Sequence, residues 1–367
     1  MEGVIVINTY PSFFNHYTFS GTHREVGRQH GETLREELRR HLEIIYNNTK
    51  RNSGISPDRA LILARKYKPY VEKYAPHFME EIIGLSEGGN ISEDEAMLLQ
   101  VRQEVVNSAR YGSPIENAPE CTAFAVGAPY TSNGKMYSGQ NSDMYDNFRP
   151  IMSVVTFKIP KKPDVMMAIP AGQLSFMGMN SEGISVNCNM LHCKGWQEGF
   201  PRYLMSRLIL EERTFEDACQ KVNIPERASQ RNILICDSEG HIANFETTPT
   251  RISRKNCTTG AFAHANHFCN EDMLFLEESN ERESRGSHNR QGRMEELFEE
   301  NKGRIDNLSL HTFLGDHQRG DDSVCMHPTE YRQYHTIVSI VNNLTDRVME
   351  VAPGNPCCNE YAIYEFK

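Results

Sequence analysis

Hydrophobic positions in the first third of the chain recur with a helical period. One stripe repeats at spacings of four, four and three residues, as on a single helix face: Leu34, Leu38, Leu42 and Ile45. The segment Thr22-His23-Arg24-Glu25 has the form of a capping box, so this helix should begin there and run to about Asn48. Further helical stretches are expected from Ala60 to Tyr74 and from Ser92 through Val105. Residues 1–120 are therefore predicted to be mainly helical.

Short β-prone runs joined by turn residues dominate the rest of the chain. Thr122 to Val126 and Met136 to Gly139 flank Asn133-Gly134, which is a strong hairpin signal. Three more pairs of runs share this layout: 176–180 with 184–188, 233–236 with 242–245, and 337–341 with 348–351. Helical stretches are interleaved at 203–212, 214–222 and 287–300. Hairpins together with flanking helices predict an α+β fold of stacked sheets covered by helices.

The composition favours a globular protein that binds a small molecule. Of the 367 residues 38% are hydrophobic, and no apolar run approaches the roughly 20 residues of a membrane helix. The first residues lack the basic region and long apolar core of a secretory signal, so a cytoplasmic location is expected. A net charge of -10 disfavours nucleic acid and anionic membranes, because binding phosphates needs clustered Lys and Arg. The oligomeric state stays open.

Cys121 stands where the helical pattern gives way to the strand pattern, after a break containing Gly112, Pro114 and Pro119. A thiol with a pKa near 8.5 is mostly protonated at neutral pH and needs a base to become a nucleophile. Cleavage of the chain before Cys121 would free an α-amine, which can serve as that base. From position alone, an inert buried cysteine is the more common interpretation.

Several motifs follow in a fixed order. Cys121-Thr122 leads through the hairpin to Gly139-Gln140-Asn141-Ser142-Asp143, and further matching stretches are 21–31, 178–184, 263–268, 316–325 and 353–357. In these motifs the chain resembles the acyl-coenzyme A:6-aminopenicillanic acid acyltransferase family, peptidase family C45. The resemblance implies a four-layer αββα N-terminal-nucleophile hydrolase fold. It also implies self-cleavage between Glu120 and Cys121, with residues 1–120 retained as a small subunit and 121–367 as the catalytic large subunit.

By this resemblance Cys121 is the nucleophile, and Asp143 lies near it to orient it or balance its charge. Asn266 is the implied oxyanion donor and Asn141 a weaker candidate. The reaction is acyl transfer through an acyl-thioester on Cys121, which water or an amine resolves, with no metal or redox cofactor. Hydrolysis of a small linear, non-peptide amide is expected first, because no cluster of basic residues marks a coenzyme A phosphate site. An acyltransferase with an amine acceptor is the alternative.

Three positions depart from the family pattern. Glu120 replaces a common Gly before the nucleophile, Ser142 replaces a common Trp, and Met326 replaces an Arg in the stretch 323–327. Glu120 and the missing arginine leave open an uncleaved, inactive relative that only binds a ligand. Asp316-His317 leaves open a mechanism in which a histidine activates Cys121 without cleavage.

Other polar groups receive structural interpretations. His264, His267 and Cys269 resemble a ligand cluster, but a closed zinc site needs four ligands and no second pair lies nearby, so no zinc site is expected. Four cysteines without C-x-x-C spacing are interpreted as packing residues: Cys188, Cys193, Cys357 and Cys358. The Arg- and Glu-rich stretch 278–300 is expected to be a solvated helix face.

Overall fold

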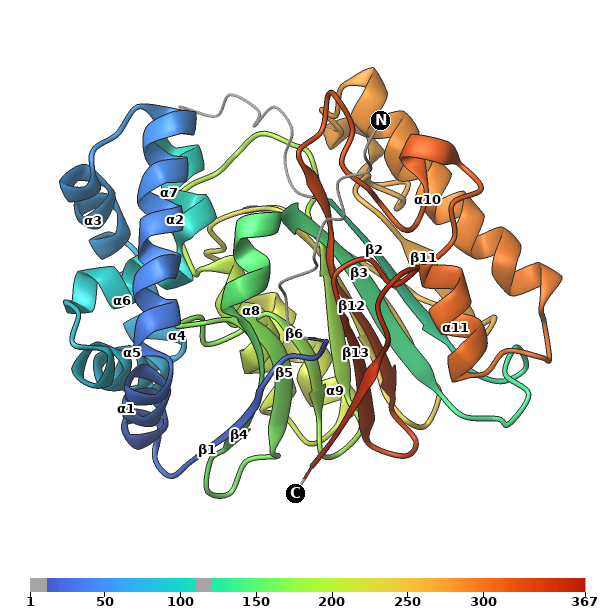
Figure 1. The fold of residues 1–367 in the computed structure, drawn as a ribbon, viewed down its shortest axis with the longest axis horizontal. Helices are drawn as coiled ribbons and strands as arrows, with labels where there is room; N and C mark the ends of the chain where they lie inside the picture. Colours follow the sequence, from blue (N-terminus) through green and yellow to red (C-terminus); the bar gives the residue numbers. More distant parts are fainter. Residues whose placement is uncertain (1–11, 110–119, 367) are drawn as a thin grey trace, which may run out of the picture.

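Two β-sheets pack face to face between two layers of helices in the computed structural model, which describes residues 12–109 and 120–366 (Figure 1). Helices α1 to α9 form the layer over the larger sheet, and α10 and α11 cover the smaller one. This four-layer αββα arrangement confirms the predicted fold class. The predicted break around Pro119 lies outside the described residues.

The larger sheet has eight strands in the order β1-β4-β5-β6-β7-β8-β9-β10. Their bounds are β1 His16–Ser20, β4 Met152–Lys158, β5 Val165–Pro170, β6 Met177–Asn180, β7 Ser185–Asn189, β8 Arg231–Cys236, β9 Ile242–Thr247 and β10 Ile252–Asn256. All neighbouring pairs are antiparallel except β1 with β4, which is parallel. The sequence analysis did not predict β1, which adds an edge strand from the N-terminal segment.

The smaller sheet has six antiparallel strands in the order β11-β2-β3-β12-β13-β14. Their bounds are β2 Glu120–Val126, β3 Tyr137–Tyr145, β11 Ala261–His264, β12 Tyr334–Asn343, β13 Val348–Pro353 and β14 Ala362–Glu365. The four predicted hairpins are all present, as β2–β3, β6–β7, β8–β9 and β12–β13. In the first of them Gly134 has φ +69°, a conformation that glycine adopts without a steric penalty.

Seven helices make up most of residues 12–109. They are α1 His23–Thr33, α2 Arg35–Ser53, α3 Pro57–Arg65, α4 Lys68–Tyr74, α5 Pro76–Gly89, α6 Glu93–Gln100 and α7 Arg102–Ala109. The capping boxes at Thr22 and Ser92 are confirmed. The single helix expected from Thr22 to Asn48 is wrong, because the chain turns at Leu34 and continues to Ser53.

The turn at Leu34 lets two helices meet different neighbours. Helix α1 lies so close to α5 that a Cβ on Gly27 would be 2.0 Å from the carbonyl oxygen of Glu81. Helix α2 instead faces the larger sheet, where His41 Nδ1 lies 2.8 Å from the carbonyl oxygen of Ala171. The expected helix 60–74 is likewise two helices, α3 and α4, with Pro69 in the first turn of α4.

The remaining helices lie in the second part of the chain. They are α8 Arg202–Leu210, α9 Phe215–Gln220, α10 Glu281–Glu300 and α11 Asn307–Leu314, with short 3₁₀ helices at Asp146–Ile151, Lys221–Asn223, Leu274–Leu276 and Gly320–Asp322. The solvated face expected for 278–300 is only half correct. One side of α10 is buried, with Gly286, Arg290 and Met294 at helical spacing, because it packs on the smaller sheet.

The segments before and after residue 120 share one hydrophobic core. The predicted stripe is buried, with Leu34 at the turn before α2 and Leu38, Leu42 and Ile45 on α2. It packs in the same cluster as the strands of the larger sheet. Buried polar contacts also cross between the segments: the Gln100 side chain donates to the carbonyl oxygen of Gly172 at 2.8 Å and accepts from the N–H of Leu174 at 3.0 Å. In the part of the chain that the structure describes, no helix is long and apolar enough to cross a membrane.

Candidate active site

Cys121 is the second residue of β2 and lies opposite Ser142 on β3. It is partly exposed and lines a pocket between the two sheets, near the end of β7 and the start of β8. Phe176, Met177 and Tyr203 supply an apolar wall of this pocket.

The thiol of Cys121 is strongly disfavoured as a thiolate in the intact chain. Burial, and next the negative charge of Asp143, raise the pKa of Cys121 to about 12, against the opposing charge of Arg290. At neutral pH the sulfur therefore holds its proton. A nearby group must accept that proton before the sulfur can attack a carbonyl.

Asp143 offers such a group. It is fully buried, its Oδ1 accepts a hydrogen bond from Thr336 Oγ1 at 2.6 Å, and its Oδ2 has no partner among the described residues. Burial raises the pKa of Asp143 to about 7, although the charge of Arg290 acts in the opposite direction. Strand β12 has a β-bulge between Thr336, which pairs with Asp143 of β3, and Val338. The bulge shifts the register of β12 against β3 next to Asp143.

Asn266 follows β11 and reaches the backbone of Cys121. Its Oδ1 accepts the N–H of Cys121 at 3.0 Å and an Nη2 hydrogen of Arg290 at 2.8 Å. Two donors on one atom fix which end of the amide is oxygen. The Nδ2 group donates to the carbonyl oxygen of Met190 at 3.0 Å, and its second hydrogen has no partner among the described residues, so it can serve an oxyanion.

Arg290 is one of the residues that the sequence analysis missed. Its side chain is fully buried, and besides Asn266 its Nε donates to Thr122 Oγ1 at 3.1 Å. Its Nη1 forms an ion pair with Glu120. The sequence did contain a signal, since Gly286, Arg290 and Met294 recur at helical spacing among charged residues. One charged residue on such a stripe indicates a buried charge with a partner.

The side chain of Asn141 binds other residues than those around Cys121 and Asn266. Asn141 faces Thr122, and its Nδ2 donates to the carbonyl oxygens of Leu314 and Val324, both at 2.9 Å. Both amide hydrogens are therefore used in binding the end of α11 and the segment before β12. In this arrangement Asn141 has no hydrogen left for an oxyanion.

The three residues that depart from the family pattern each have a hydrogen-bond or ion-pair partner in the structure. Glu120 is buried between Arg290 and the Tyr334 hydroxyl, which donates to its Oε1 at 2.5 Å. Ser142 accepts from Gln140 Nε2 at 2.9 Å within the same strand. Met326 is buried, and its N–H donates to Thr336 Oγ1 at 3.0 Å.

Three arginines from separate segments meet at the pocket of Cys121: Arg102, Arg202 and Arg231. Nε and Nη1 of Arg202 and Nε of Arg102 are buried without a hydrogen-bond partner among the described residues. Within the described ranges none of the three forms an ion pair, although the negative charge of the buried Glu104 acts on both Arg102 and Arg202. The sequence contains no local basic cluster that marks a coenzyme A phosphate site, and these three arginines come together only in the folded chain.

The histidines lie elsewhere. No histidine of the described chain lines the pocket with Cys121. His317, considered as an alternative base, lies next to His327, with their Nε2 atoms 3.1 Å apart. Near α10, His264 Nε2 contacts Glu246 Oε1 at 3.2 Å, while His267 Nδ1 contacts Ser287 Oγ at 2.7 Å. The side chains of these two histidines are thus engaged with different partners.

The αββα layers are those of the N-terminal-nucleophile hydrolase class, which contains amidohydrolases and acyltransferases. The chain belongs to the acyl-coenzyme A:6-aminopenicillanic acid acyl-transferase family, whose model matches residues 130–357. It is 27% identical over 290 residues to the 40 kDa form of acyl-coenzyme A:6-aminopenicillanic-acid-acyltransferase from Emericella nidulans, across 77% of each chain.

Two solved structures are similar at lower identity. A variant of conjugated bile acid hydrolase from Clostridium perfringens has a TM-score of 0.48 and 12% identity, over 67% of this chain and 97% of its own. Penicillin V acylase from Agrobacterium tumefaciens has a TM-score of 0.41 and 10% identity, over 64% of this chain and 82% of its own.

Proposed function

We propose that the protein cuts its own chain between Glu120 and Cys121 and then hydrolyses a small linear amide through an acyl-thioester on Cys121. The observation that carries this proposal is the hydrogen bond from the Cys121 N–H to Asn266 Oδ1. The same oxygen would hold the freed α-amine after cleavage. The amine would then stand beside its own thiol as the base.

Self-cleavage would begin with transfer of the Cys121 thiol proton to Asp143. The sulfur attacks the carbonyl carbon of Glu120, the Glu120–Cys121 C–N bond breaks, and the leaving amine takes up a proton. The product is a thioester between the Glu120 acyl group and Cys121 Sγ. Water hydrolyses this thioester, which leaves a Glu120 carboxylate, a free thiol and a free α-amine.

Hydrolysis of a substrate would repeat these steps on an external amide. The α-amine accepts the thiol proton and returns it to the leaving amine, while the unpaired Nδ2 hydrogen of Asn266 stabilises the oxyanion. Cys121 must stay reduced for this chemistry, which agrees with the expected cytoplasmic location.

The three pocket arginines support an anionic substrate. Guanidinium nitrogens of Arg102 and Arg202 are buried without a hydrogen-bond acceptor, which is costly, and a carboxylate on the substrate would supply that acceptor. We therefore propose that the amide carries a carboxylate on its acyl or its amine part. An amine acceptor in place of water would make the enzyme an acyltransferase, and adding amines to the assay distinguishes the two reactions by product.

Intact mass spectrometry of the expressed protein tests the proposal. Wild type should give fragments of 120 and 247 residues, in proportion about 14 and 28 of the 42.0 kDa, whereas Cys121→Ala should stay whole. Cys188→Ala is the matched control, because this cysteine lines the same pocket and should leave cleavage intact. Uncleaved, inactive wild type would refute the proposal.

A further inference from the structure

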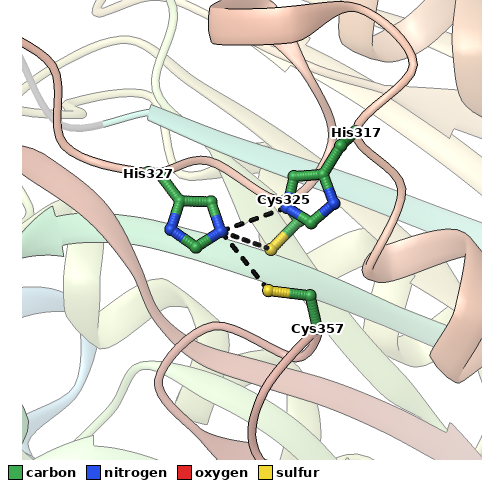
Figure 2. A group of neighbouring side chains, drawn as sticks. All are labelled: His317, Cys325, His327 and Cys357. Carbon is green, nitrogen blue, oxygen red and sulfur yellow. Dashed lines mark hydrogen bonds between the residues drawn. The ribbon is translucent and has the colours of Figure 1, made fainter.

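Two histidines and two cysteines converge at one point outside the pocket of Cys121 (Figure 2). His317 follows α11, Cys325 and His327 precede β12, and Cys357 follows β13. Their ligand atoms all lie within 4.8 Å of one another. The sequence analysis had interpreted Cys357 as a packing residue, but the structure places it on the surface in this cluster.

The three separations from His327 Nε2 are close to those around a tetrahedral metal ion. His327 Nε2 is 3.1 Å from His317 Nε2, 3.3 Å from Cys357 Sγ and 3.8 Å from Cys325 Sγ. Zinc bonds of about 2.0–2.1 Å to nitrogen and about 2.3 Å to sulfur give tetrahedral edges of about 3.3–3.8 Å. The side chains thus already stand near the positions of ligands.

Hydrogen bonds cannot account for this convergence. All three contacts meet on His327 Nε2, as the dashed lines of Figure 2 show. One imidazole nitrogen carries either one hydrogen or one lone pair, so it can satisfy only one of the three partners. A cation between the four atoms would use a lone pair from each of them.

We propose that His317, Cys325, His327 and Cys357 bind one zinc ion. Two thiolates and two imidazoles form a closed Cys₂His₂ set, which is typical of structural zinc. Hard cations such as Mg²⁺ and Ca²⁺ prefer oxygen ligands, and this set contains none. The other ligand groups among the described residues have three members each.

The zinc would fasten the loop between α11 and β12 to the loop after β13. Met326 lies between the ligands Cys325 and His327 in the sequence. Its N–H donates to Thr336 Oγ1, and the Thr336 hydroxyl in turn donates to Asp143 Oδ1. Val324, directly before Cys325, accepts from Asn141. The ion would thereby stabilise one wall beside Asp143 without taking part in the chemistry of Cys121.

The metal content of the purified full-length protein tests the site. After loading with zinc and dialysis, inductively coupled plasma mass spectrometry should find one zinc ion per chain in wild type. His317→Gln and Cys357→Ser should lose it. Losing only a hydrogen-bond partner of a ligand typically weakens metal binding roughly 10–100-fold, and losing a ligand should cost more. His241→Gln and Cys257→Ser, which alter residues outside the cluster, should keep the metal.

Cobalt substitution provides a second readout that a misfolded variant cannot imitate. Cobalt-loaded wild type should show thiolate-to-metal charge-transfer absorption together with the intense visible bands of a tetrahedral ion. Cys357→Ser, measured in excess cobalt rather than after dialysis, should keep only part of the charge-transfer absorption, because Cys325 is then the one thiolate ligand of the cluster. Wild type without stoichiometric metal, equal metal in all variants, or a Cys325–Cys357 disulfide in unreduced peptides would each overturn the proposal. The Cys121→Ala variant should still bind zinc, which separates this site from the proposed cleavage.

Discussion

The guanidinium group of Arg290 forms an ion pair with the carboxylate of Glu120, the residue directly before Cys121. Both side chains are buried, and the same guanidinium donates to Asn266 and Thr122. One arginine of α10 therefore holds both sides of the peptide bond that we propose is cut. A glutamate at this position, unusual for the family, has a partner of opposite charge.

Removing Arg290 should destabilise the uncleaved chain. In a Cys121→Ala background, Arg290→Met leaves the Glu120 charge buried, and loss of one partner of a buried pair typically costs about 3–5 kcal/mol. Chemical denaturation measures this free energy of unfolding. Adding Glu120→Gln should restore part of the loss, and Arg285→Met, on the exposed side of α10, should cost little. Equal stability of both arginine variants would contradict the assignment.

Self-cleavage should accelerate as the pH rises through about 7. The pKa of Asp143 is raised to about 7 by burial, so below that pH the carboxyl is protonated and cannot accept the thiol proton. Following fragment formation from pH 5 to 9 after refolding should reveal this inflection. Asp143→Asn should remove it and slow cleavage, whereas Asp164→Asn, a surface change, should not. A flat profile in wild type would rule Asp143 out as the acceptor.

Substitutions of Asn266 and Asn141 should have different effects, because we expect Asn266 to be catalytic and Asn141 to be structural. With residues 1–120 and 121–367 co-expressed as two chains, Asn266→Ala should lower kcat for the amide about 10²–10³-fold, as loss of an oxyanion donor typically does. Asn141→Ala should instead lower the melting temperature, because two buried carbonyl oxygens lose their donor at about 1–3 kcal/mol each. A large kcat loss in folded Asn141→Ala would reverse the assignment.

Arg202 should select for anionic substrates. For two amides that differ only by carboxylate versus carboxamide, wild type should prefer the carboxylate about 10- to 100-fold in kcat/KM, the range of a charge-assisted hydrogen bond. Arg202→Met should abolish most of this preference and change the neutral amide little. Arg213→Met, 56% exposed, is the control. Unchanged preference in Arg202→Met would exclude this role.

The two fragments should remain associated after cleavage. Glu81 of the N-terminal segment and Arg207 of α8 form an ion pair at 3.3 Å with both side chains buried, and β1 pairs with β4. Gel filtration in native buffer should therefore yield one species that contains both fragments, and only denaturant should separate them. Separate elution in native buffer would show that the shared core does not survive cleavage.

Local signals in the sequence predicted the hairpins and the capping boxes, since turn residues and capping side chains act on backbone within a few positions. They could not show the turn at Leu34, which depends on α1 meeting α5. Nor could they show β1, because its strand partner β4 lies more than a hundred residues away.

By itself, the sequence determined the layered α+β class, the family motifs and the position of Cys121 at the start of the strand-rich part. Only the tertiary structure decided which polar groups meet. It brought Arg290 to Glu120, three arginines to the pocket, and His317, Cys325, His327 and Cys357 to one point. Side chains from distant segments interact through space, and the positions that they share are set by the packing of whole layers rather than by spacing along the chain.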